Sequence, residues 1–303
     1  MTLPFPPGTA HPIPLLIRHG DLGIELFFTL SGFVICLLVT SPRFEPQSFV
    51  IQRVFRIWPL WLATSCIFLY LTRYIGRSAE QTIPAFFYSL TLLPTHGFPF
   101  YDIGWSLQHE IAFYLVAALI VPRFGIYWLI GLLSLCALLD HAVTLPWYLH
   151  QYFHYYPYFA GGIVACLLRP YAKQAGVLLP FAGGIATLIL ASGSLLPIAM
   201  FLLIVGFANL RASSAVGRLF VALGDASYSI YLLHPLVLVY VYIHLRAPLP
   251  PSWVQEPLRY GALITVCFLS LASWRYFEKA MIAIGRRLSN RASLAELQTK
   301  QEV

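Results

Sequence analysis

Charged residues are scarce in this sequence of 303 residues: Asp, Glu, Lys and Arg together make up 10%, whereas hydrophobic residues make up 59%. The mean hydropathy of +0.74 lies outside the range of soluble domains, because a soluble fold could not bury so much apolar surface. Apolar runs of about 17 to 22 residues recur along the chain, and each is long enough to cross a hydrocarbon core as a helix. The scarcity of charge therefore excludes a soluble domain and predicts an all-α, polytopic transmembrane helical bundle.

Cysteine is also rare, with five residues that all fall inside apolar runs. They lack the close spacing of zinc ligands, so we expect no metal site and interpret them as small core residues. The net charge of +7 does not indicate a nucleic-acid partner, because the basic residues are distributed between the apolar runs and in the C-terminal tail. Membrane lipid is the partner that this distribution predicts.

The apolar runs predict about nine spans, near residues 23–40, 55–72, 104–121, 125–140, 153–169, 175–192, 195–210, 226–245 and 259–277. A tenth run, 82–94, is shorter and contains two prolines. If this run does not cross the membrane, most connections that contain Lys or Arg lie on one side. Loops 141–152 and 193–194, which contain neither residue, then lie on the other side. The basic side should be the cytoplasm. We therefore predict that 82–94 is an interfacial or re-entrant segment on the outer face.

This topology places residues 1–22 outside the membrane, before a first span that runs inward. The segment is rich in proline and has neither the basic nor the apolar region of a signal peptide, so nothing in it would carry it across. Either a preceding helix has been lost, through truncation or a wrongly assigned start, or the orientation is unusual, and we favour the lost helix. The predicted division is an extracytoplasmic segment 1–22, a transmembrane domain 23–280 and a basic cytoplasmic tail 281–303.

Glu110 lies about 9 Å into its predicted helix, counting from Gly104. An ionisable group near the bilayer centre costs about 2.5 to 3.5 kcal/mol, so such groups usually face a cavity or a partner. Ser106 lies four residues before Glu110 and shares its helical face. The carboxylate has three possible roles: to orient a histidine, to accept a hydrogen bond from a sugar hydroxyl, or to pair with an arginine. A purely structural ion pair is the alternative.

Arg53 and Arg56 form an R-x-x-R pair, so their guanidinium groups project from one helical face near the predicted membrane edge. Arginine forks suit phosphate oxygens. Two arginines at a helix end also serve as anchors that reach lipid headgroups, and sequence alone favours that interpretation.

Two further polar residues remain open. Glu25 begins the first span near several glycines, and it is either an interfacial residue or part of a site. His234 lies mid-span just before a proline, where a lone histidine is more often structural. The aromatic run 151–159 is more typical of an interfacial belt than of a platform for sugar stacking.

Taken in order, five segments resemble the successive motifs of the membrane acyltransferase 3 family. They are GDLGIELFFTLSGFVI, SFVIQRVFRIWPLW, WSLQHEIAFYL, LGDASYSIYLLHPL and SWRYFEKAM. The resemblance extends from about Gly20 to Lys279.

The resemblance implies a ten-helix bundle, which matches nine spans plus one missing helix. It also implies transfer of an acyl group, such as acetyl, from acyl-CoA as co-substrate to a carbohydrate, glycolipid or other hydroxyl acceptor in a bacterial inner membrane, with no permanently bound cofactor. By motif position, Arg53 and Arg56 match an arginine pair expected to contact the donor's phosphates. Trp105, Ser106 and Glu110 match a W-S-L-x-x-E element, and Glu25 replaces the usual aspartate.

The same resemblance predicts a histidine base at the end of the first helix, which this sequence does not contain. His11 and His19 precede the first motif, but proline-rich sequence stands where that helix should end. His19 is the candidate base in the present chain, with Glu110 and Glu25 as the candidate catalytic carboxylates. Arg53, Arg56, Trp105, Ser106 and His234 are the candidate substrate-binding residues.

Two other functions remain open. A non-enzymatic transporter or flippase of a lipid-linked glycan would also need a polar cavity, but it would often show repeated halves, and no internal symmetry is visible. An inactive, truncated relative is the other alternative.

Overall fold

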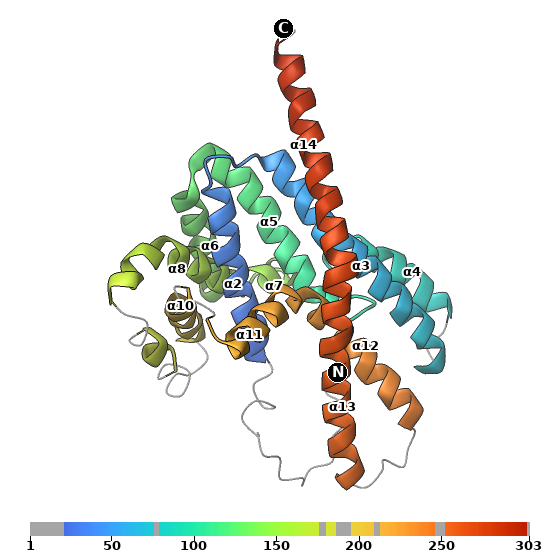
Figure 1. Cartoon of the computed structure of the whole chain (residues 1–303). Coiled ribbons are helices and arrows are strands. Elements are labelled where there is room, and N and C mark those ends of the chain that lie inside the picture. The colour runs from blue at the N-terminus through green and yellow to red at the C-terminus, as the bar shows by residue number, and fades with distance from the viewer. Residues whose placement is uncertain are drawn as a thin grey trace.

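The computed structural model describes residues 21–75, 79–175, 180–185, 195–208, 213–245 and 252–301. Every regular element within these ranges is a helix, which confirms the all-α prediction (Figure 1). The helices are α2 (Asp21–Val39), α3 (Pro46–Ile75), α4 (Ala79–Leu90), α5 (Gly104–Phe124), α6 (Ile126–Ala142), α7 (Trp147–Phe153), α8 (Tyr156–Ala175), α10 (Leu196–Phe207), α11 (Ala215–Asp225), α12 (Ser227–Leu245), α13 (Ser252–Ser273), η2 (Trp274–Glu278) and α14 (Lys279–Gln301). Residues 1–20, which include His11 and His19, lie outside the described ranges.

Three of these helices are long and apolar enough to cross a bilayer, in α2, α3 and α5. A fourth span arises if α11 and α12, which meet at a bend of 73°, are counted together. The chain is therefore a multi-pass membrane protein. The number nine stays a prediction, since the span predicted at 175–192 is described only at residue 175 and residues 180–185.

Helix α4 corresponds to the short run predicted at 82–94. It has 12 residues, so its length of about 18 Å falls short of the hydrocarbon core. It packs on α3, where the indole Nε1 atoms of Trp58 and Trp61 donate hydrogen bonds to the carbonyl oxygens of Leu90 and Ser89 at 3.1 and 3.3 Å. The side of the membrane on which it lies stays a prediction.

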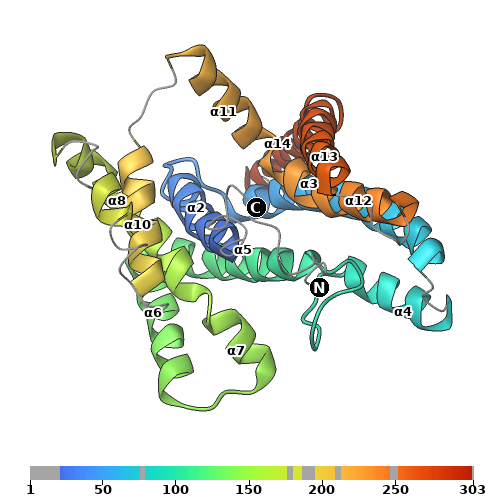
Figure 2. The same ribbon diagram turned by 90° about the horizontal axis from the view of Figure 1, so that it is seen from below.

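Helices α2 and α5 lie near the middle of the bundle (Figure 2). Helices α6, α8 and α10 lie on one side of them, and α3, α12, α13 and α14 on the other. Aromatic rings fill the centre: Phe159 of α8 packs on Phe113 of α5 at 4.3 Å and on Phe28 of α2 at 4.9 Å between ring centroids. This packing holds the polar residues of α2 and α5 at fixed positions.

Two glycines allow α2 and α8 to approach closely. A Cβ atom at Gly32 would collide with the carbonyl oxygen of Phe159, and one at Gly162 with that of Thr29. Because both obstacles are backbone atoms, no side-chain rotation could relieve the overlap. Small residues serve the same purpose in other membrane helix pairs.

The C-terminal segment is one long helix from Ser252 to Gln301, interrupted by a π-helical turn at Trp274–Glu278. The helix that contains the predicted span 259–277 therefore begins earlier, at Ser252. The residues of the predicted basic tail, 281–303, continue the same helix as far as Gln301. Helix α14 packs along α3, where Gln52 Nε2 donates a hydrogen bond to Ser289 Oγ at 3.2 Å. This contact fixes α13 and α14 against the helix that carries Arg53 and Arg56.

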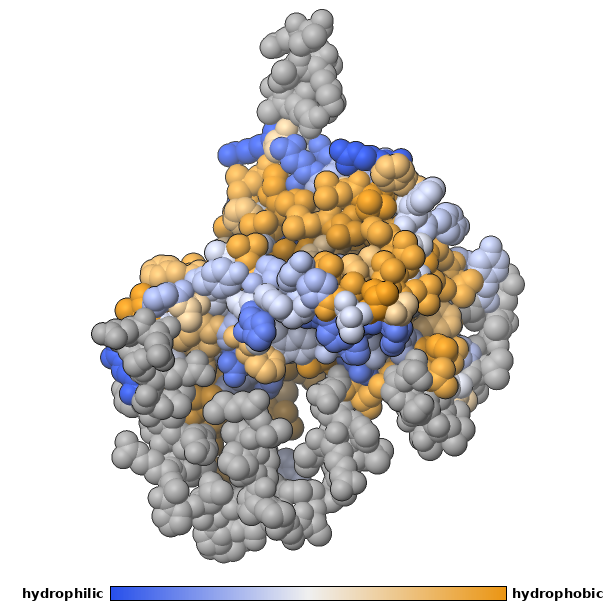
Figure 3. All heavy atoms as spheres, turned by 180° about the vertical axis from the view of Figure 1, so that it is seen from behind, coloured by the Kyte–Doolittle hydropathy of each residue, from blue (hydrophilic) through white to orange (hydrophobic). Residues whose placement is uncertain are grey.

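A broad hydrophobic surface lies below a hydrophilic band at the α14 end of the molecule (Figure 3). Large apolar side chains are exposed on several helices, among them Leu30, Leu62, Leu119, Leu138 and Phe268. Exposed apolar area on this scale is typical of a surface that faces lipid.

A methyl group at Gly162 should separate α2 from α8. We expect Gly162→Ala to lower the melting temperature of the detergent-purified protein by at least about 2 to 4 °C, because overpacking costs about 1–3 kcal/mol. Gly131→Ala is the matched control, since nothing lies within 4 Å of a Cβ atom there. Equal melting temperatures for the two variants would contradict the close approach.

Candidate functional site

The carboxylate of Glu110 lies at the centre of the candidate site. Glu110 is the seventh residue of α5 and only 7% exposed. Its Oε1 atom accepts a hydrogen bond from Tyr114 OH, one turn further along α5, and one from Ser31 Oγ on α2 at 3.4 Å. The carboxylate is therefore held between two helices by two hydroxyl groups.

Arg53 and Arg56 of α3 are the positively charged neighbours of this carboxylate. The sequence placed them at the predicted membrane edge, but α3 begins at Pro46, so both arginines stand well inside the helix. Both interact electrostatically with Glu110. The guanidinium of Arg53 also lies over the rings of Phe49 and Tyr114, at 5.5 and 5.6 Å from their centroids. The structure thus brings together three residues that the sequence analysis selected separately.

One donor of this arginine pair is left over. The Nε atom of Arg53 is buried and makes no hydrogen bond within the described ranges. A buried donor without a partner is destabilising unless a ligand or water satisfies it. The arginine therefore retains capacity to donate to an acceptor atom of a ligand.

A second buried carboxylate, which the sequence analysis did not select, joins the group. Glu278 ends the π-helical turn and is 2% exposed. Its Oε1 atom accepts a hydrogen bond from Ser229 Oγ, which in turn lies 2.7 Å from Ser273 Oγ. Arg56 interacts electrostatically with Glu278 as well as with Glu110. Arg56 therefore has two acidic neighbours, Glu110 from α5 and Glu278 from η2.

The charge of Glu278 at the end of an apolar run was the signal that could have identified it. The π-helical turn could not be predicted, and it changes which way the side chains of this segment face. Tyr114 was detectable by its spacing of four residues from Glu110. Tyr228, whose hydroxyl donates to the Ile57 carbonyl oxygen at 2.7 Å, gave no sequence signal.

Trp105 and Ser106 lie one turn before Glu110, toward the start of α5. Ser106 is fully buried, and its Oγ atom is 2.7 Å from the hydroxyl of Tyr231, which donates to the Ile103 carbonyl oxygen at 2.9 Å. The Trp105 ring packs on Phe28 at 6.1 Å. These contacts connect α5 to α12 and α2.

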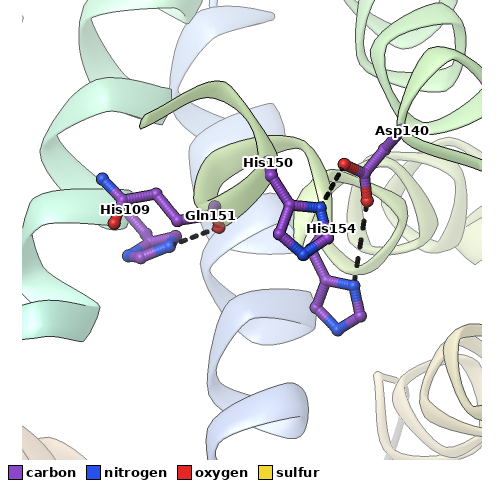
Figure 4. Close-up of polar contacts among 5 residues, drawn as sticks. All are labelled: His109, Asp140, His150, Gln151 and His154. Carbon is purple, nitrogen blue, oxygen red and sulfur yellow. Dashed lines mark hydrogen bonds and ion pairs between the residues drawn. The ribbon is translucent and has the colours of Figure 1, made fainter. Parts of the chain in front are cut away.

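His109, next to Glu110, connects α5 to α7. Its ring nitrogens each lie 2.7 Å from a backbone carbonyl oxygen, Nδ1 from that of Trp105 and Nε2 from that of Gln151 (Figure 4). The sequence analysis did not single out this histidine. Its contact with Gln151 fixes the position of α7 relative to the Glu110 helix.

Among the remaining predicted residues, the His234 ring lies 5.9 Å from the ring of Tyr231, the hydrogen-bond partner of Ser106. Glu25 on α2 interacts with the hydroxyl of Tyr158 on α8. His234 is partly buried in α12, and its Nδ1 atom lies 3.2 Å from the Ile230 carbonyl oxygen. No hydrogen bond between described residues joins His234 to Arg53, Arg56 or Glu110. Roles in the site for Glu25, His234 and His19 stay predictions.

The group formed by Arg53, Arg56 and Glu110 can bind an anion and hold a proton acceptor close to it. Arginine forks match phosphate oxygens, and a buried carboxylate can accept a hydrogen bond from a hydroxyl group. In the described part of the chain, no group of three or more His, Cys, Asp or Glu residues could hold a metal ion.

Comparison with known proteins is consistent with this chemistry. The family model described as "Acyltransferase domain" matches residues 2–274. The exopolysaccharide production protein ExoZ of Rhizobium meliloti (strain 1021) is 26% identical over 310 residues, which cover 91% of this chain and 94% of ExoZ. No solved structure matches the chain.

The hydroxyl of Tyr114 should stabilise the protein through Glu110. We expect Tyr114→Phe to lower the free energy of unfolding by about 1–3 kcal/mol, measured by equilibrium denaturation in micelles, since a buried acceptor loses a donor. In a Glu110→Gln background the same change should cost less, because the two residues are coupled. Tyr127→Phe, at an exposed ring of α6, is the control. Equal losses in both backgrounds would show that the hydroxyl acts independently of Glu110.

Proposed function

We propose, from the premise that the chain belongs to the acyltransferase 3 family of acyltransferase domains, that it transfers an acetyl group from acetyl-CoA to a hydroxyl group of a carbohydrate or glycolipid. We assign this reaction to surface polysaccharide modification at the bacterial inner membrane. The name of the relative ExoZ, which refers to exopolysaccharide production, supports a polysaccharide acceptor.

The burial of Glu110 beside Arg53 and Arg56 is the observation that carries this proposal. Charged groups inside an apolar bundle are costly unless a partner or a ligand compensates them. A bundle that needed only stability would be served as well by apolar residues at these positions. We therefore assign the arginines to the phosphates of acyl-CoA and Glu110 to the acceptor hydroxyl.

In the proposed reaction, the acceptor hydroxyl oxygen attacks the thioester carbonyl carbon. The carbon–sulfur bond breaks, the CoA thiolate leaves, and the hydroxyl proton passes to a base. Glu110 and Glu25 are the proposed catalytic carboxylates, and His19 is the proposed histidine base. Trp105, Ser106 and His234 are proposed to contact substrate. Holding both substrates at one site contributes much of the rate enhancement.

The proposed topology has nine spans and a segment at 82–94 that does not cross, with 281–303 in the cytoplasm. Donor binding near Arg53 and Arg56 then takes place on the cytoplasmic side. The short length of α4 supports this arrangement, since 12 helical residues do not reach across the bilayer.

Transfer of radiolabel from acetyl-CoA to the host's surface polysaccharide, in membranes that carry the protein, tests the proposal. Arg53→Ala should lower kcat/KM at least about tenfold, because a hydrogen bond to a charged group contributes about 1.5–3 kcal/mol. Glu110→Ala should abolish transfer. Because each change also removes a buried polar group, transfer is compared at equal amounts of protein in the membrane.

Arg43→Ala is the matched control, since Arg43 is an exposed arginine in the connection just before α3. Its label transfer should equal that of the wild type. If the loss of transfer by Arg53→Ala disappears once activity is divided by membrane abundance, a structural role is supported instead. Absence of transfer by the wild type, beside normal transfer by an active relative, would favour a glycan transporter or an inactive relative.

A further inference from the structure

A hollow of about 440 Å³ lies where α6 ends and the chain turns toward α7. We call it the α6–α7 hollow, and its lining residues are Asp140, His141, Ala142, Val143, Thr144, Leu145 and His150. Small-molecule sites commonly enclose about 300–1,000 Å³. None of the residues assigned above to donor or acceptor chemistry lines it.

A buried carboxylate orients a histidine at the edge of this hollow. The side chain of Asp140 is 4% exposed, and its Oδ1 atom lies 2.6 Å from Nδ1 of His150, whose side chain is 60% exposed (Figure 4). Because an ionised carboxylate only accepts hydrogen bonds, Nδ1 carries the proton. The Nε2 atom of a neutral His150 ring is then an acceptor, and it makes no hydrogen bond to the described residues.

His154 extends the same group. Its Nδ1 atom lies 3.9 Å from Oδ2 of Asp140, and its ring centroid is 5.9 Å from that of His150. Both rings are largely exposed, so one buried carboxylate lies between two accessible imidazoles. This arrangement fixes the position of two hydrogen-bonding groups without covering them.

Two exposed aromatic side chains lie at the start of α7, and Trp147 is one helical turn before His150. Trp147 and Tyr148 are 42% and 47% exposed, and the Trp147 ring meets the ring of His96 edge to face at 5.1 Å. Rings of this kind offer a flat apolar face together with a polar edge. The carbon–hydrogen face of a sugar ring packs well on such a surface.

The charges favour a neutral, hydroxyl-bearing ligand over an anion. The sequence from 124 to 168 contains no Lys or Arg, so a phosphate group would meet Asp140 without a permanent positive charge to balance it. A bound metal ion is not supported either, since the described residues contain no group of three metal-ligating side chains.

The hollow is connected to the Glu110 site through α7. Gln151 follows His150, and its carbonyl oxygen lies 2.7 Å from His109, the neighbour of Glu110. A ligand bound against α7 is thus in contact with a helix whose position depends on α5.

We propose that the α6–α7 hollow binds a sugar unit of the acceptor, with Nε2 of His150 accepting a hydrogen bond from a sugar hydroxyl and Asp140 fixing the ring. Trp147, one helical turn before His150, provides the adjoining stacking surface. The inference rests on the proposed function, because it identifies where the carbohydrate acceptor is held.

Steady-state transfer by the full-length protein tests it, with labelled acetyl-CoA and oligosaccharides released from the host's surface polysaccharide. His150→Asn keeps a donor near the Nδ1 position but removes Nε2. We expect it to raise the KM for oligosaccharide about three- to tenfold, as for one lost hydrogen bond, with the KM for acetyl-CoA unchanged. Asp140→Asn should have a similar effect, and Tyr171→Phe, at an exposed ring of α8, should have none.

An unchanged KM for oligosaccharide in His150→Asn, or an equal rise in both KM values, would overturn the inference. A direct binding measurement distinguishes this inference from the proposed function. Oligosaccharide should quench the tryptophan fluorescence of the wild type, and Trp147→Phe and His150→Asn should weaken that quenching. If the wild type transfers no label but shows this pattern, the hollow binds sugar and the proposed reaction is wrong. If it shows no quenching, the hollow is not a sugar site.

Discussion

The burial of the Glu110 carboxylate among apolar helices is the constraint on which the rest of this structure depends. A buried carboxylate needs hydrogen-bonding or charged partners, because an unpaired buried polar group is destabilising. Its neighbours come from three helices: Ser31 from α2, Arg53 and Arg56 from α3, and Tyr114 from α5 itself. The positions of these helices are therefore interdependent, and the chemistry of the site follows from how they meet.

Helix α2 shows how backbone packing and polar contacts are combined. Ser31 faces α5 and bonds to Glu110, whereas the next residue, Gly32, lies against the backbone of Phe159 in α8. Successive residues of a helix are separated by about 100°, so one short segment serves two neighbours. The absence of a side chain at Gly32 brings α8 close, and the hydroxyl of Ser31 reaches the carboxylate.

The second acidic neighbour depends on a local change of helix type. The π-helical turn at Trp274–Glu278 places Glu278 where it accepts a hydrogen bond from Ser229 and interacts with Arg56. Periodicity could not predict this, since a sequence pattern assumes a regular helix from end to end. The α6–α7 hollow was also beyond prediction, because Asp140 and His150 are separated by a turn whose path depends on how α7 packs.

The sequence by itself determined that this chain is a helical membrane protein, that its motifs follow the order of an acyltransferase family, and that Glu110 is a costly residue to keep in an apolar span. These conclusions depend on composition, local periodicity and residue type, which are properties of the chain alone. Only the tertiary structure decided that α3 begins early enough to carry both arginines to Glu110, and that Glu278 joins them. Such contacts join residues far apart in the chain, and they form only when the helices have packed.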